Sequence, residues 1–169
     1  MIIPAQHIRA LCDGSYGAKP MIEPFVERSV SDGMSYGLSI AGYDIRIKQD
    51  VTLYPLGYDE DKESFSLAST LERFDLPSDV LGHVADKSTW ARRGLAVQNT
   101  ILEPGWNGYL TIELSNHGPD ILRIKAGMPI AQIVFHRLEA PAERAYSGKY
   151  QGQANEPVAA KEEQSHEPA

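Results

Sequence analysis

The chain has 169 residues, which is enough for one domain with a sizeable core. With 42% hydrophobic and 23% charged residues, its composition is that of a globular protein. The net charge of −7 excludes a broad basic surface for duplex nucleic acid, although a few convergent cations would suffice for a small anionic ligand. Cys12 is the only cysteine, so the chain has no intramolecular disulfide and is a poor candidate for a thiolate zinc site.

Sequence signals predict the cellular location of the protein and the extent of its folded domain. The first residues, MIIP, lack the basic and apolar regions of a signal peptide, and no apolar run approaches the roughly 20 residues of a membrane span. We therefore expect a cytoplasmic protein. Residues 154–169 contain four glutamates and one lysine but few large apolar side chains, which predicts a disordered acidic tail after a folded domain at 1–153.

Short strands make up most of the predicted elements. A short helix at 4–13, in which Ile8 and Leu11 share a face, is followed by an extended segment at 21–25 and a polar loop at 29–36. Alternating apolar residues then predict strands at 43–47, 51–54, 64–68, 109–114 and 130–135. A possible strand at 80–85 leads into a second short helix at 88–93. Many short strands separated by Gly- and Pro-containing turns indicate an all-β barrel or sandwich.

Residues 86–94, DKSTWARRG, concentrate groups that bind phosphate. Two hydroxyls and three cations lie at the start of the expected helix, where backbone N–H groups also favour an anion. Ser88 and Arg92 are four residues apart and therefore share one helix face. The alternative is a solvated helix with a serine at its cap, because such clusters are common.

Residues 99–108, NTILEPGWNG, form a second candidate segment. They indicate a strand that leads into a turn beside an aromatic ring. A sugar or base could pack on Trp106, and Glu103 could accept a hydroxyl of the sugar. The alternative is a plain structural turn.

Glu113 stands within an apolar alternation, LTIEL. If Leu110, Ile112 and Leu114 face one side of the strand, then Thr111 and Glu113 share the other side. Glu113 is then either an ordinary solvent-facing residue or a base held on a rigid strand.

The sequence lacks the motifs of several other activities. Its five histidines show neither HxxxH nor HxH spacing, and the zinc-deaminase signature of H-x-E followed by P-C-x-x-C is missing. No P-loop, dinucleotide-binding fingerprint or G-x-S-x-G elbow is present. We therefore expect a site with no metal ligands.

From about residue 1 to 153, the sequence resembles the deoxycytidine triphosphate (dCTP) deaminase family. The resemblance depends on a series of blocks in the family's order: MIEPF at 21–25, SYG at 35–37, GYDIR at 42–46, KSTWAR at 87–92, LEPGW at 102–106, LTIELSN at 110–116, IAQ at 130–132 and GKYQGQ at 148–153. Two motifs, GYD at 42–44 and AGMPIAQ at 126–132, also resemble trimeric dUTPases and do not separate the two branches.

This resemblance implies a fold and an assembly. The fold is mainly all-β, a distorted antiparallel β-barrel of the dUTPase-like type with one or two short helices. The assembly is a homotrimer with an active site at each subunit boundary. The implied partner is a deoxyribonucleoside triphosphate, with no nucleic-acid polymer and no membrane.

Individual residues also receive roles by this resemblance. Glu113 matches the catalytic glutamate, and Ser88 and Arg92 assist it. The implied substrate-binding residues are Lys87, Ser88, Thr89 and Arg92 at the phosphates, Thr100 at the cytosine, Glu103, Trp106 and Leu110 at the deoxyribose, and Tyr146, Lys149 and Gln153 in a carboxy-terminal lid.

The implied reaction is hydrolytic deamination of dCTP to dUTP and ammonia. Glu113 takes a proton from water, the hydroxide attacks C4 of cytosine, and Glu113 returns protons toward the leaving amine. No tightly bound cofactor is implied, and Mg²⁺ is expected only as the ion carried by the triphosphate.

Three alternatives stay open at this point. A bifunctional enzyme would continue to dUMP and pyrophosphate, and a dUTPase would act on the uracil nucleotide alone. Against a dUTPase, the ending GKYQGQ differs from a Gly- and Arg-rich arm with an aromatic. The third alternative is a non-catalytic trimer that only binds nucleotide, because a fold does not guarantee a function.

Overall fold

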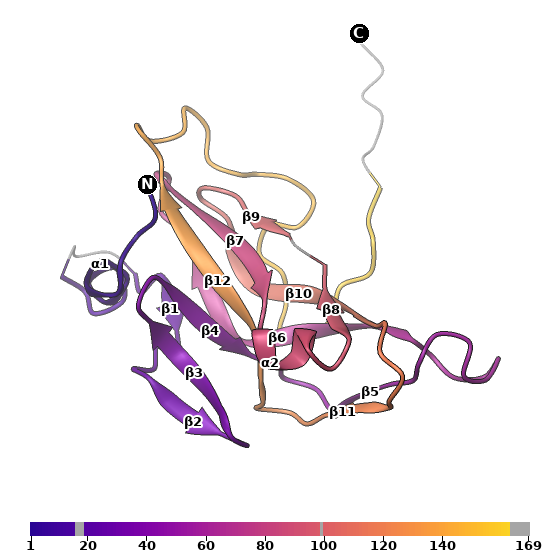
Figure 1. Ribbon diagram of the computed structural model, residues 1–169. Coiled ribbons are helices and arrows are strands. Elements are labelled where there is room, and N and C mark those ends of the chain that lie inside the picture. The colour runs from indigo at the N-terminus through magenta and orange to yellow at the C-terminus, as the bar shows by residue number, and fades with distance from the viewer. Residues whose placement is uncertain (16–18, 99, 163–169) are drawn as a thin grey trace, which may run out of the picture.

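The computed structural model describes residues 1–15, 19–98 and 100–162. These residues form mostly strands, with two short helices (Figure 1). In chain order the elements are α1 (Ala5–Ala10), β1 (Ile22–Glu23), β2 (Ser29–Ser31), β3 (Met34–Ser39), β4 (Gly42–Arg46), β5 (Val51–Leu53), β6 (Phe65–Asp75), β7 (Val80–Asp86), α2 (Ser88–Ala91), β8 (Leu95–Val97), β9 (Ile101–Leu102), β10 (Asn107–Asn116), β11 (Leu122–Ile124) and β12 (Pro129–Arg137). The mainly all-β class is confirmed. None of the described helices is long and apolar enough to cross a membrane.

Antiparallel pairing joins the described strands into two larger sheets and one small one. The first sheet has the order β2-β3-β4-β12-β7-β9, the second has the order β1-β6-β10-β8, and β11 pairs with β5. In Figure 1 the long strands β6 and β10 run across the direction of β12. Because β6 and β10 pair along most of their length, they form a rigid support for the residues that they carry.

One continuous core lies between the sheets. Tyr43 and Phe135 come to it from the first sheet, and Phe74, Ile112 and Leu114 come from the second, each fully buried. Burial of a large apolar side chain contributes about 1.5–3 kcal/mol to stability, so this core fixes the position of β10 relative to β4 and β12.

The polar loop predicted at 29–36 is wrong. Strands β2 and β3 form a hairpin there, with Ser29 opposite Tyr36 and Ser31 opposite Met34. Its turn consists of Asp32 and Gly33, with φ angles of 50° and 74°. An Asp-Gly pair with two positive φ angles favours a tight hairpin, which the polarity of the segment does not reveal.

Other predicted strands are in the right places but have different lengths. β6 extends to Asp75, beyond the predicted end at residue 68, because its later part pairs with β1 and the start of β10. Residues 42–45 of β4 are buried without alternation, since neighbouring elements cover both faces of this strand. The short strands β8 and β11 were not predicted, because three residues are too few to show a periodicity.

Candidate functional site

Seven of the predicted site residues line one cavity, which we call the β10 cavity. The seven are Thr100, Glu103, Trp106, Leu110, Glu113, Tyr146 and Gln153. The volume of the cavity is about 360 Å³. The other lining residues are mainly apolar, and apart from Thr111, which was predicted to share the face of Glu113, no sequence signal pointed to them: Phe65, Leu67, Ile101, Leu102, Thr111, Tyr150, Val158 and Ala160. Apolar walls with a few polar groups are typical of sites for small organic ligands.

Glu113 lies in β10 between two neighbouring segments, and its backbone pairs with both. Its backbone lies opposite Leu67 of β6, and its carbonyl oxygen accepts a hydrogen bond from Gln98 N at 2.9 Å. The side chain is half-buried, and burial raises the pKa of this carboxyl group above its ordinary value of 4.5. A carboxyl group whose pKa lies closer to neutral pH is suited to take a proton from water and return it.

Leu110 both belongs to the core and lines the β10 cavity. The alternation predicts that it lies with Ile112 on the core side, where it is buried, and it also lines the β10 cavity together with Thr111 and Glu113. The pairing of β10 with β6 shifts register between Tyr109 and Thr111, and Leu110 N donates a hydrogen bond to the hydroxyl of Thr70 at 3.0 Å. Such an irregularity re-aims the side chains on a strand, which periodicity along one strand cannot reveal.

The residues after β12 close one side of the cavity. Trp106 Nε1 donates a hydrogen bond to the carbonyl oxygen of Tyr150 at 2.7 Å, and Thr111 N donates one to Gln153 Oε1 at 3.1 Å. Gly108 lies so close to this segment that a Cβ atom there would be 2.6 Å from Gln153 N. These contacts fix Gln153 and Trp106 on the same cavity wall.

Part of the predicted tail also contacts the cavity. Val158 N donates a hydrogen bond to Thr111 Oγ1 at 3.0 Å, and the carbonyl oxygen of Asn155 accepts one from Lys48 Nζ at 2.6 Å. No sequence signal pointed to Val158, because these contacts depend on backbone groups. Residues 163–169 of the tail lie outside the described residues, so the domain boundary at 153 and the disorder of the tail stay predictions.

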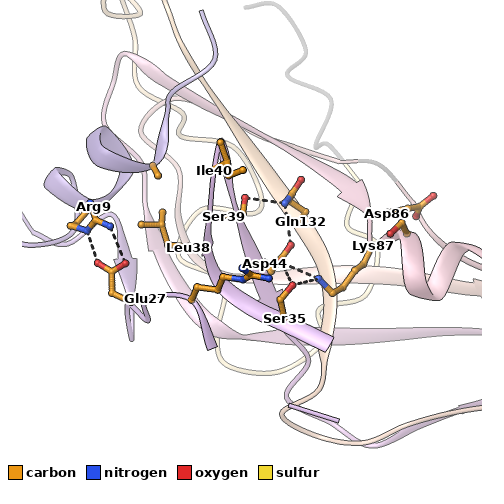
Figure 2. A pocket seen from close by; sticks show the side chains of 13 residues that line it. Arg9, Glu27, Ser35, Leu38, Ser39, Ile40, Asp44, Asp86, Lys87 and Gln132 are labelled. Carbon is orange, nitrogen blue, oxygen red and sulfur yellow. Dashed lines mark hydrogen bonds and ion pairs between the residues drawn. The ribbon is translucent and has the colours of Figure 1, made fainter. Parts of the chain in front are cut away.

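Lys87 and Ser88 line a different cavity, which we call the α2 cavity (Figure 2). Its volume is about 640 Å³, and it lies between α1, β3, β4, β12 and the start of α2. The Lys87 side chain is almost buried, and Lys87 Nζ is 2.9 Å from Asp44 Oδ2. Ser88 is exposed at the first residue of α2 and lines this cavity.

The remaining predicted residues lie elsewhere. Arg92 is exposed and lines a groove of about 780 Å³ together with Arg93 and residues 118–123. Thr89 is half-buried in α2. The Lys149 ammonium lies 5.4 Å from the centre of the Tyr150 ring, close to the β10 cavity.

The predicted catalytic residues therefore line three different hollows of the chain. Glu113 lines the β10 cavity, Ser88 lines the α2 cavity, and Arg92 lines the third groove. These lining sets have no residue in common. Each chain thus supplies a carboxylate in an apolar pocket and, separately, a surface with hydroxyls and cations.

Comparison with known proteins identifies relatives of this chain. Residues 57–138 match the dCTP deaminase-like family. A dCTP deaminase of Campylobacter fetus is 40% identical over 159 aligned positions, which cover 79% of this chain and 86% of the relative. The chain belongs to the dCTP deaminase family. Another dCTP deaminase, from Granulibacter bethesdensis, is 39% identical, and the alignment covers 90% of this chain and 95% of that relative.

Solved structures extend the likeness to the fold. The 2′-deoxycytidine 5′-triphosphate deaminase of Agrobacterium tumefaciens superposes with a TM-score of 0.59 at 16% identity, covering 80% of this chain and 47% of that chain. The dUTPase of EIAV superposes with a TM-score of 0.53 at 18% identity, covering 76% and 98%. At these identities the two structures show a common fold. The predicted dUTPase-like fold is confirmed.

Proposed function

We propose that the protein catalyses the hydrolysis of dCTP to dUTP and ammonia. One water molecule supplies the new oxygen at C4 of the cytosine, and the exocyclic amino group leaves with the protons it needs. Glu113 takes a proton from the water as general base and delivers protons to the leaving amine as general acid. General acid–base catalysis of this kind contributes about 10²–10⁴-fold to a rate.

The observation that carries this proposal is the environment of Glu113. Its carboxyl group is half-buried on a paired strand, within an apolar cavity, and burial raises its pKa. The apolar wall that includes Trp106 and Leu110 suits the flat base and the deoxyribose. The Glu113 carboxylate is the acid–base group that we propose for activating water.

The other residues of the β10 cavity would orient the nucleoside. We assign the base to the backbone around Thr100 and a sugar hydroxyl to Glu103. Tyr146, Lys149 and Gln153 would close over the triphosphate. Mg²⁺ would arrive with the substrate as the counter-ion of its phosphates.

A homotrimer would bring the separate surfaces together. Ser88 and Arg92 line other hollows of the chain than Glu113 does, which supports a site that combines residues from more than one subunit. In this assembly, the hydroxyls and cations around α2 would meet the triphosphate while Glu113 of a neighbouring subunit faces the base. Cations and hydroxyls are the donors that phosphate oxygens bind.

Product analysis with the purified protein tests the proposal. dCTP and Mg²⁺ are added, ammonia is quantified, and the nucleotides are separated by ion-exchange chromatography. Equal amounts of dUTP and ammonia are the expected result. Formation of dUMP and pyrophosphate would instead indicate the bifunctional enzyme, and binding of dCTP with no ammonia released under any condition would indicate a binding protein.

A further inference from the structure

Two sequence motifs that the proposed reaction leaves without a role meet in the α2 cavity. One is GYD at 42–44 in β4, and the other is AGMPIAQ at 126–132, which ends in β12. Their last residues, Asp44 and Gln132, lie opposite each other in the ladder between these strands. Gln132 Nε2 donates hydrogen bonds to Asp44 Oδ1 at 3.2 Å and to Ser39 Oγ at 3.1 Å (Figure 2).

Asp44 is 6% exposed, and the structure supplies donors to both oxygens of its carboxylate. Oδ1 accepts the bond from Gln132. Oδ2 accepts one from Lys87 Nζ at 2.9 Å and one from Ser35 Oγ at 3.2 Å. A buried carboxylate is costly unless it is paired and hydrogen-bonded, so this network holds Asp44 and its partners in one arrangement.

Lys87 belongs both to this network and to the surface that we propose binds the phosphates. It precedes Ser88 directly, and both residues line the α2 cavity with Asp44. A lysine ammonium has three N–H donors, and the contacts with Asp44 and Ser35, the latter at 3.5 Å, involve two of them. The third can therefore serve a ligand in the cavity. Fixing a long side chain in advance reduces the entropy that binding would otherwise cost.

We propose that Asp44 is a positioning residue that orients Lys87 toward the phosphates of the nucleotide. Gln132 and Ser35 assist by holding the Asp44 carboxylate. This inference rests on the proposed function, because it assigns the phosphates to the surface around Lys87 and Ser88. Repulsion between a carboxylate and the phosphates would change the affinity in the opposite direction. The sign of the change in affinity on removing the charge decides between the two.

The test is equilibrium binding of dCTP and of 2′-deoxycytidine to the Asp44→Asn variant. We expect the affinity for dCTP to fall about three- to tenfold, which is the range for losing one pre-ordered long side chain, with the affinity for 2′-deoxycytidine unchanged. The matched control is Asp79→Asn, which breaks the ion pair of Asp79 with Arg137 outside the α2 cavity. Unchanged or tighter binding of dCTP by Asp44→Asn would overturn the proposal, as would an equal loss for both ligands.

Two further variants keep the test informative if Asp44→Asn does not fold. Ser35→Ala removes one hydroxyl contact and should weaken dCTP binding about twofold, again without an effect on 2′-deoxycytidine. In the Lys87→Met background, Ser35→Ala should cause no additional loss of dCTP affinity, because Ser35 acts through Lys87. Full additivity of the two losses, or no effect of Ser35→Ala, would contradict the positioning role.

These measurements also separate this inference from the proposed reaction. If the wild-type protein binds dCTP but releases no ammonia, the proposed reaction is refuted and the binding test of Asp44 still applies. If the wild-type protein deaminates dCTP and the Asp44→Asn variant binds dCTP with normal affinity, only the role of Asp44 is refuted.

Discussion

Replacing Glu113 with glutamine tests the centre of the proposed chemistry. The amide has almost the same shape as the carboxyl group but can neither accept the proton of water nor return it. The loss of general acid–base catalysis predicts a fall in kcat of about 10²–10⁴-fold. The apolar walls of the β10 cavity are unchanged, so the affinity for dCTP should stay within about threefold of the wild-type value.

The same substitution should stabilise the fold above the carboxyl pKa. Burial raises the pKa of Glu113 in the folded state above its unfolded value, which means that the ionised form is disfavoured by folding. This cost is absent below the unfolded pKa of 4.5 and is fully present above the folded pKa. Because Glu113 is half-buried, solvent screens part of the cost, and we expect a gain in Tm of about 1–2 °C at pH 8.

The assay combines three readouts on one preparation: ammonia release, equilibrium binding of dCTP, and thermal unfolding at pH 8 and pH 4. A matched control is Glu139→Gln, the same chemical change at an exposed position outside the β10 cavity, which should alter none of them. A Glu113→Gln variant that keeps wild-type turnover would refute the acid–base role. A variant that is less stable than the wild type at pH 8 would refute the argument from burial.

Three other predictions follow from the structure. The acidic limb of the pH profile of kcat should have its midpoint above pH 4.5, because Glu113 must be ionised to act as a base and burial raises its pKa; a midpoint at or below 4.5 would argue against Glu113. Arg46→Met should lower the free energy of unfolding, measured with urea at pH 8, by about 3–5 kcal/mol, because it leaves the fully buried Glu72 carboxylate without its cation. This loss should become smaller as the pH falls and Glu72 takes up a proton. A zinc chelator with Mg²⁺ resupplied should leave ammonia release unchanged; loss of activity that zinc restores would contradict a carboxylate-driven reaction.

Local sequence signals predicted the strands that carry the site. The alternation around Glu113 correctly placed it on a strand on the same side as Thr111, and the segment at 88–93 correctly predicted the short helix α2. The Asp32-Gly33 hairpin could also have been predicted, because its turn signal is local. The register shift of β10 between Tyr109 and Thr111 could not, since it involves the pairing of two strands.

The sequence by itself determined the fold class, the family resemblance and the kinds of groups available for chemistry, because these depend on residue types and on periodicity within short segments. Only the tertiary structure decided which groups meet. Asp44 and Lys87 are 43 positions apart in the chain, and their contact depends on β4, β7 and β12 pairing in one sheet. Tertiary packing likewise placed Glu113 and Ser88 on separate surfaces, because strand pairing and burial set distances that residue spacing along the chain does not contain.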